Sequence, residues 1–499
     1  KMKNVLEWLE ATVAKYPDKP AFSDTESSIT FRQVYDIARN TGAYLVEQLG
    51  VDRTPVAVFA GRKMVTPAYF LGVVYAGRPY APIDASLPDK RIEKILENLC
   101  PRAIVADRES REHVESIVDE LAKAEGFDRP QIFIAEDISH FEQVACADSN
   151  CKISESSGDA VTDSENDTDG GVVAGCAGKT DDSALEKLAT VRRQMSMTDP
   201  LYIIYTSGST GNPKGVMTSH LSLMTYINAY CDVMHIEESD VLGNQSPLDY
   251  IAAIRDIYLP LKTGCSTAII PKEYFMEPNA LFDYMNDKKV SSVGWSVSAF
   301  TILTSLGAFE EVGLKSLRKI CFSGSVMPCR VLRKWQENLP EAHFVNQYGP
   351  TEATASCTYY SVDHLVEEDE VLPIGKAYDN YRVFLIDEHG NDPAVGEQGE
   401  ICVCGPILAL GYYNDPERTA AAFTLNPLNR AYPERMYRTG DYGRLDEAGI
   451  LHFCGRMDRQ IKHMGHRVEL DEVEHAANVV DGVAESCVIY NKAKEVLIL

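Results

Sequence analysis

The sequence lacks an excess of positive charge. Its 48 lysines and arginines stand against 74 aspartates and glutamates, which gives a formal net charge of −26 at pH 7. Long-range repulsion from such a chain opposes binding to nucleic acid and to anionic membranes. No apolar run has the length of a membrane span, and the first residues, KMKNVLEWLE, contain no signal-peptide core. We therefore expect a cytoplasmic protein with no nucleic-acid partner and no membrane partner.

Metal-ligand spacing is also absent from the 13 cysteines, which are scattered along the chain. Cys402 and Cys404 lie in an alternating pattern, which predicts that both are small core residues on one face of a strand. This use of cysteine favours a reducing compartment. With 499 residues, of which 45% are hydrophobic and 24% charged, the chain has ample material for a core. Its length alone predicts two or three domains.

Large apolar residues are scarce between about residues 148 and 183, where Ser, Asp, Gly and Thr dominate. Such a segment cannot bury enough surface to offset the entropy of ordering, so we expect a disordered acidic insertion. A tolerated surface insertion is favoured over a partner-binding segment, because loop length costs little stability.

Elsewhere, expected strands alternate with helical stretches, a pattern that favours an α/β fold. Helical periodicity covers residues 6–14, 31–49 and 91–98, a buried strand spans residues 56–59, and residues 397–410 alternate like an antiparallel strand.

One loop carries the strongest chemical signal. It follows the apolar strand pattern of residues 201–204 and runs from Tyr205 to Gly215 as YTSGSTGNPKG. Glycines allow close approach to an anion, while hydroxyls, backbone N–H groups and Lys214 can bind its oxygens. The spacing of a Walker loop is absent. A flexible Gly/Ser linker, the alternative, explains neither the preceding strand nor the lysine.

Three further clusters follow in order along the chain. Residues 346–352 (NQYGPTE) combine a flat ring, a hydroxyl and a carboxylate of the kind that Mg²⁺ prefers. Residues 437–441 (YRTGD) and 455–462 (GRMDRQIK) add a carboxylate and an arginine, followed by Gly465, Arg467, Glu469 and Glu474. Each cluster alone is moderate support, since Gly-Asp and Gly-Arg turns are common.

Taken together, these motifs resemble those of an adenylation domain of a nonribosomal peptide synthetase, within the superfamily that includes acyl-CoA ligases and luciferases. Similar motifs also occur at Ile29–Phe31, Leu71–Glu93, Gly399–Ile401 and Gly411–Tyr412. The resemblance implies a large N-terminal subdomain of layered sheets and helices over residues 1–457. It implies a small α+β C-terminal subdomain from residue 458.

The resemblance also implies an ATP site with Mg²⁺. Tyr348 would stack on adenine beside Gly349, Thr351 would contact the α-phosphate and Glu352 would hold Mg²⁺. Asp441 and Arg456 would bind the ribose hydroxyls, although an arginine in such a turn can also make only a surface salt bridge. The β- and γ-phosphates would meet Thr206, Ser207, Gly208, Ser209, Thr210, Gly211 and Lys214.

The C-terminal region departs from the family. Asp458 resembles the family's hinge, about which the small subdomain rotates, and Lys462 would face the large subdomain during thioester formation. Relatives carry a catalytic lysine in a Gly-Lys motif further on, which is missing before Leu499. We therefore expect residues 458–499 to be the start of a truncated C-terminal subdomain. The chain as given should bind ATP and amino acid but adenylate poorly.

For the substrate, Asp249 matches the aspartate that binds the α-ammonium in amino-acid activators. The alternative is a helix N-cap, because an apolar run follows it. Trp295 is expected at one pocket position, but a shift of one residue in the match to the family would place Gly294 there. Bulky rings with serines and a glutamine predict a small or polar substrate side chain. The residues expected to line the pocket are Tyr250, Ala253, Trp295, Cys321, Ser323, Gln347, Ala355 and Ser356.

Three functions remain open at this point. The first is ATP-dependent activation of an amino acid as aminoacyl-AMP, followed by transfer to the phosphopantetheine thiol of a carrier protein. The second is an acyl- or aryl-CoA ligase, in which Asp249 would meet no ammonium. The third is a non-catalytic nucleotide-binding module.

Overall fold

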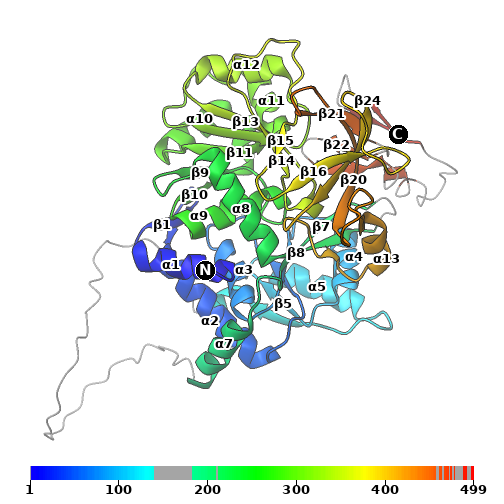
Figure 1. The fold of residues 1–499 in the computed structure, drawn as a ribbon. Helices are drawn as coiled ribbons and strands as arrows, with labels where there is room; N and C mark the ends of the chain where they lie inside the picture. The colour runs from blue at the N-terminus through cyan, green and yellow to red at the C-terminus, as the bar shows by residue number, and fades with distance from the viewer. Residues whose placement is uncertain are drawn as a thin grey trace, which may run out of the picture.

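A computed structural model describes residues 2–139, 182–208, 212–456, 460–463, 466–470, 473, 474, 477, 487–491 and 496–499. Three large sheets with helices packed around them make up most of these residues (Figure 1). The predicted α/β fold is confirmed. Asp458 and the expected domain boundary lie outside the described residues, as does the insertion between residues 140 and 181.

The first sheet has seven strands, and its central strands are parallel. Strands β3, β4 and β5 are four-residue runs that are buried throughout, as expected for parallel strands covered on both faces. In order across the sheet the strands are β18 (Gly411–Tyr412), β8 (Lys214–Ser219), β7 (Pro200–Thr206), β4 (Tyr80–Ile83), β3 (Val56–Phe59), β5 (Ala103–Ala106) and β6 (Gln131–Ile134).

The helices of this lobe follow the sequence patterns closely. Helix α2 begins with a capping box between Thr30 and Gln33, which satisfies backbone N–H groups of its first turn. Helix α7 begins at Asp182, so the last two residues of the expected insertion are helical. The helices are α1 (Val5–Lys15), α2 (Phe31–Leu49), α3 (Thr66–Tyr75), α4 (Asp89–Leu99), α5 (Arg111–Leu121), α6 (Ala135–Ser139) and α7 (Asp182–Gln194).

The second sheet has nine strands and a parallel centre, with antiparallel strands at both edges. Its order is β15 (Lys376–Ala377), β14 (Thr358–Ser361), β13 (His343–Tyr348), β12 (Lys319–Ser323), β11 (Ser292–Ser296), β9 (Val241–Asn244), β10 (Ser266–Ile269), β1 (Pro20–Ser23) and β2 (Ser28–Thr30). Its helices are α8 (His220–Met234), α9 (Ile254–Thr263), α10 (Pro278–Asp287), α11 (Val297–Ser305) and α12 (Cys329–Asn338), with short 3-10 turns η1 (Ile251–Ala253), η2 (Lys272–Met276) and η3 (Thr351–Ala353).

The third sheet is antiparallel and has five strands, with α13 (Pro416–Ala422) beside it. Cys402 and Cys404 are both buried in its core beside Met436, which confirms that prediction. The predicted strand over residues 397–410 is too long, because the chain turns at Gly405 with φ of 123°. The strands are β16 (Arg382–Ile386), β17 (Gln398–Cys404), β20 (Arg435–Leu445), β19 (Phe423–Leu425) and β21 (Leu451–Arg456).

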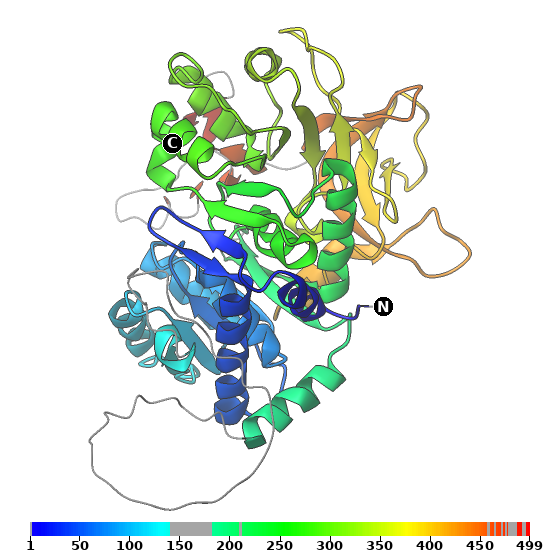
Figure 2. The same cartoon turned by 90° about the vertical axis from the view of Figure 1, so that its left-hand side faces the viewer.

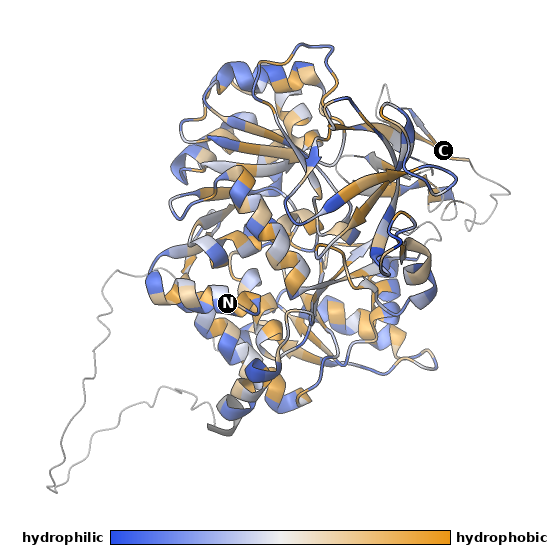
Figure 3. Ribbon diagram, in the orientation of Figure 1, coloured by the Kyte–Doolittle hydropathy of each residue, from blue (hydrophilic) through white to orange (hydrophobic). Residues whose placement is uncertain are grey.

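The remaining strands form two hairpins near the C-terminus: β22 (Gln460–His463) with β23 (His466–Glu469), and β24 (Ile489–Asn491) with β25 (Val496–Ile498). Figure 2 shows the first sheet's lobe below the second, with the third sheet beside both. Apolar residues concentrate on the strands and on the inner faces of the helices (Figure 3). Within the described parts of the chain, we find no helix with the length and apolarity of a membrane span.

Candidate active site

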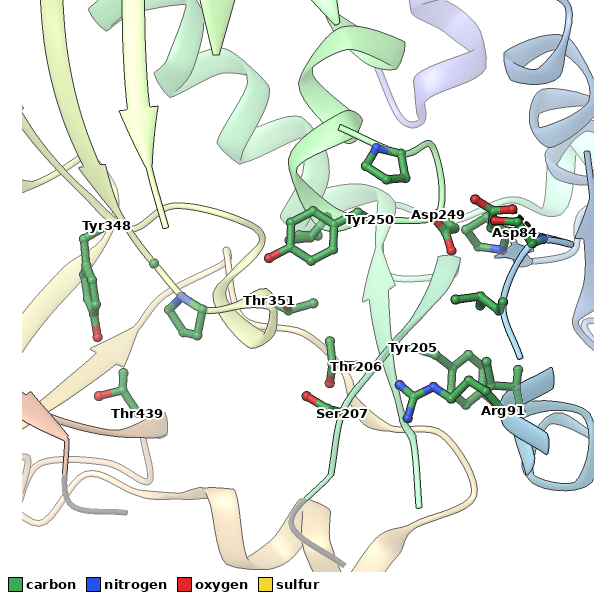
Figure 4. A pocket seen from close by; sticks show the side chains of 18 of the residues that line it. Asp84, Arg91, Tyr205, Thr206, Ser207, Asp249, Tyr250, Tyr348, Thr351 and Thr439 are labelled. Carbon is green, nitrogen blue, oxygen red and sulfur yellow. Dashed lines mark hydrogen bonds between the residues drawn. The ribbon is translucent and has the colours of Figure 1, made fainter. Parts of the chain in front are cut away.

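A cavity of about 320 Å³ lies where the three sheets meet. Its walls come from the end of β4 and from β7 in the first sheet, from β13 in the second, and from β20 and β21 in the third. Figure 4 shows side chains from these distant segments converging on one space. The cavity has the size of a small-molecule site. Of the predicted nucleotide-site residues, it is lined by Thr206, Ser207, Tyr348, Gly349, Thr351, Asp441 and Arg456.

The phosphate loop, the segment from Tyr205 to Gly215 that was predicted to bind phosphate, leaves strand β7 directly into this cavity. The Oγ1 of Thr206 is buried and, within the described structure, has no hydrogen-bond partner, so this hydroxyl can bind a ligand oxygen. Gly208 is required by the fold of the loop, because a Cβ there would collide with the carbonyl oxygen of Asn212. Ser209, Thr210 and Gly211 lie outside the described residues.

Lys214 and Glu352 do not line the cavity, and their charged groups face each other. The Lys214 Nζ lies 3.9 Å from Oε1 of Glu352, and the Glu352 side chain is fully buried. The hydroxyl of Tyr412 donates to the same Oε1 at 2.8 Å, which fixes the carboxylate from one side. Burial is the main cause that raises the pKa of Tyr412, so the hydroxyl stays protonated and able to donate. A carboxylate held in this way suits Mg²⁺, which binds hard oxygen ligands together with substrate phosphates.

A second group of residues, Tyr348, Asp441 and Arg456, lines the cavity and is connected by hydrogen bonds. The Tyr348 hydroxyl donates to Oδ2 of Asp441 at 2.5 Å, and Nη1 of Arg456 lies 2.5 Å from Oδ1. Strands β20 and β21 place Asp441 and Arg456 opposite each other in register. Arg456 therefore makes a salt bridge, as the alternative interpretation held, but its partner is the other predicted ribose residue and both line the cavity.

Asp249 lies in the turn between β9 and η1 and faces the cavity close to Asp84 (Figure 4). Burial and, next, the charge of Asp84 raise the pKa of Asp249 to about 6. The N-cap alternative is wrong, because the residue before η1 is Tyr250 and no side chain caps that turn. A buried carboxylate beside a second one attracts a cationic group, which agrees with an ammonium site.

The residues predicted to line a substrate pocket do not all reach the cavity. Tyr250 lines it, whereas Ala253, Cys321, Gln347 and Ser356 are buried and are not among the lining residues. Ser323 and Ala355 are half-buried and are not among the lining residues.

Trp295 is not brought to the site. Its indole N–H donates to the Gly243 carbonyl at 2.8 Å, and its ring packs in the aromatic core with Phe275 and Phe300. Successive side chains on a strand point to opposite faces, and the pairing of Gly294 with Cys321 places Gly294 on the face of the other candidates. Gly294, and not Trp295, therefore lies on the strand face that carries Cys321, which favours the alternative of a one-residue shift.

Several cavity residues were missed by sequence reasoning. Asp84 and Arg91 lie in the stretch Leu71–Glu93, already singled out as a motif, where a polar residue directly after a buried strand is a usable signal. Tyr412, which donates to Glu352 and does not line the cavity, was also missed, although it lies in the Gly411–Tyr412 motif. Lys272 lines the cavity from η2 and carried no such signal.

Comparison with known proteins places this site in a family. The family model described as AMP-binding enzyme matches residues 9–413. The chain is 30% identical over 483 residues to D-alanine--D-alanyl carrier protein ligases of Bacillus cereus (strain Q1) and Bacillus thuringiensis (strain Al Hakam), covering 96% of this chain and 84% of each relative.

Solved structures share the fold. NpsA-ThdA, an artificially fused adenylation-PCP di-domain nonribosomal peptide synthetase from Klebsiella oxytoca, is 19% identical with a TM-score of 0.76, and the match covers 100% of this chain and 87% of that one. Holo-PA1221, which contains adenylation and PCP domains, is 24% identical with a TM-score of 0.75, and the match covers 99% and 75%. The chain thus belongs to the AMP-binding enzyme family and has the fold of nonribosomal peptide synthetase adenylation domains.

Proposed function

We propose that this protein is an amino-acid adenylating ligase of the nonribosomal peptide synthetase type. It activates an amino acid with ATP and passes it to the phosphopantetheine thiol of a carrier protein. The observation that carries the proposal is the composition of one cavity, which joins the predicted nucleotide residues to the buried Asp249 carboxylate. Asp249 supplies a carboxylate that can bind an α-ammonium group, and an acid without an amine has no such group.

The reaction follows from charge. A carboxylate oxygen of the substrate attacks the α-phosphorus of ATP, a P–O–C(acyl) linkage forms, and the bond to pyrophosphate breaks. Both reactants are anionic, so positioning and local positive charge supply the catalysis. Thr351 and the phosphate loop would bind the phosphates, while Asp441 and Arg456 would fix the ribose. Glu352 would hold Mg²⁺, which neutralises phosphate charge when bound.

Transfer to a carrier protein is supported by the named relatives, which are carrier protein ligases. The thiolate of a phosphopantetheine arm would attack the acyl carbon, forming a thioester and releasing AMP. In this scheme Asp458 is the hinge and Lys462 faces the large subdomain in the second half-reaction. These two roles, the division at residues 457 and 458, and a cytoplasmic location stay predictions.

Amino-acid-dependent ATP–pyrophosphate exchange by the natural full-length protein tests the proposal. The panel contains the proteinogenic amino acids, the D-enantiomers of alanine, aspartate and glutamate, and a few fatty and aryl acids. Exchange with an amino acid that is lost in Asp249→Ala, with ATP binding retained, supports the proposal. Exchange only with acids that lack an amine moves the protein to the CoA ligases.

A further inference from the structure

Arg255 occupies the place in which the substrate pocket was predicted. It lies in the first turn of α9, and only 3% of its surface is exposed. Its guanidinium donates from Nη2 to the Gly294 carbonyl at 2.6 Å and from Nη1 to Oε1 of Gln347 at 3.4 Å. Nη1 also lies 3.7 Å from the sulfur of Cys321. Cys321 and Gln347 were predicted to line the substrate pocket, and Gly294 was the alternative to Trp295 there.

This guanidinium lies over the Tyr230 ring, 5.7 Å from its centroid, and makes no direct ion pair among the described residues. In the described structure no carboxylate lies within salt-bridge distance of it, and its Nε has no hydrogen-bond partner. Although burial opposes it, the charge of the adjacent Asp256 acts on the guanidinium and raises the pKa of Arg255, while the Asp256 Oδ2 accepts from Asn244 at 2.8 Å. Arg62 also binds Asn244, so two buried guanidinium groups face one carboxylate. An arginine stays protonated when buried, and an uncompensated buried charge is costly.

The fold leaves space for the Arg255 guanidinium, and short chain segments link Arg255 and its partner Gln347 to residues that line the cavity. A Cβ on Gly294 would lie 2.7 Å from the Arg255 Cζ, so the glycine reserves the space that the guanidinium fills. Tyr250 and Ile251, which line the cavity, lead through η1 directly into α9. Gln347 precedes Tyr348, which lines the cavity from β13. Arg255 itself does not line the cavity, but it follows lining residues along the chain and binds a neighbour of one.

We propose that Arg255 is a specificity-determining residue that recognises an anionic group on the substrate side chain, so that the enzyme activates an acidic amino acid. The inference rests on the proposed function and names its substrate class. Asp249 would hold the α-ammonium at one end of the substrate. Arg255 would bind a second carboxylate at the other end through a charge-assisted pair of hydrogen bonds. Of the small or polar substrate side chains predicted from the sequence, the proposal selects those that carry a carboxylic acid.

Pyrophosphate exchange by the natural full-length protein, with matched pairs of substrates, tests this assignment. The pairs are aspartate with asparagine, glutamate with glutamine, and 2-aminoadipate with norleucine, each in both enantiomers, beside alanine and glycine. We expect one acidic amino acid to exceed its neutral partner at least ~100-fold in kcat/KM, because an unpaired buried charge rejects the neutral analogue. Arg255→Met should lose this preference and gain activity with the neutral partner.

Two controls separate recognition from stability. Arg255→Lys keeps the charge without the two-pronged geometry and should retain part of the preference. Arg78→Met removes another buried arginine, far along the chain, and should leave the ratio of acidic to neutral substrates unchanged. ATP binding by each variant, measured by calorimetry, reports folding.

The results with the substrate panel distinguish failure of the acidic-substrate inference from failure of the proposed function. If the unmodified protein prefers alanine, glycine or another neutral amino acid, the inference is overturned and the proposed function stands, with Arg255 acting only as the closed end of a small pocket. Exchange with no amino acid overturns the proposed function itself. The substrate panel for the unmodified protein decides between these results even if Arg255→Met does not fold.

Discussion

Replacing Asp249 with asparagine should stabilise the folded protein and abolish its activity. In the folded state burial and the neighbouring Asp84 raise the pKa of Asp249 from its ordinary value of 3.8 to about 6. The folded protein therefore binds a proton more tightly than the unfolded chain between these pH values. Stability contributed by the protonated group is present below pH 3.8 and is lost as the pH rises through about 6.

The size of the effect follows from that difference of about two pH units. Each unit corresponds to ~1.4 kcal/mol, so ionised Asp249 costs the fold about 3 kcal/mol above pH 7. Asparagine keeps the shape and carries no charge. In a chain of this length, the melting temperature of Asp249→Asn should exceed that of the unmodified protein by ~3 °C at pH 8 and should equal it near pH 4.

Thermal unfolding followed by circular dichroism between pH 4 and pH 8, paired with pyrophosphate exchange, measures both effects. The exposed Asp363→Asn removes one carboxylate outside the cavity and serves as the matched control. A variant that melts at or below the unmodified protein at pH 8 would refute the buried-carboxylate argument. Retained exchange with an amino acid would refute the ammonium role.

Three further predictions concern the other walls of the site and its core. Asp441→Asn should raise the KM for ATP ~10- to 100-fold, because Arg456 loses its partner and the ribose loses a charged acceptor; ATP titrations of exchange activity measure this. Tyr412→Phe should lower kcat ~10-fold by freeing the Glu352 carboxylate, and excess Mg²⁺ should restore part of the loss if the carboxylate binds the metal. Trp295→Phe should cost about 1–3 kcal/mol in urea unfolding, because the Gly243 carbonyl loses its donor, while the order of preferred amino acids stays the same.

The fold could be predicted well where a local pattern is sufficient. Helix α2 begins and ends at the predicted residues, and β3 coincides with its apolar run. Both elements are defined by neighbours in sequence, through a cap, a period or a buried stretch. The end of β17 was missed because the turn at Gly405 depends on backbone geometry that alternation of apolar residues does not encode.

The nucleotide side of the site was predictable from motifs, since each motif carries its residues together at the end of a strand. The substrate side was not, because it depends on register between strands far apart in sequence. Trp295 and Gly294 are adjacent in the chain, yet the pairing of β11 with β12 puts them on opposite faces. Arg255 was missed for the same reason: its partners come from β11, β12 and β13, so its burial cannot be recognised from the residues around it.

The central claim, that this cavity activates an α-amino acid, is tested most directly by comparing each active amino acid with the acid of the same carbon skeleton that lacks the amine. Both are measured in ATP–pyrophosphate exchange with the natural full-length protein at pH 8, where Asp249 is ionised. The account predicts that kcat/KM for the deaminated acid falls at least ~100-fold in the unmodified protein, and that Asp249→Asn loses exchange with the amino acid. Equal exchange with both acids in the unmodified protein would contradict it.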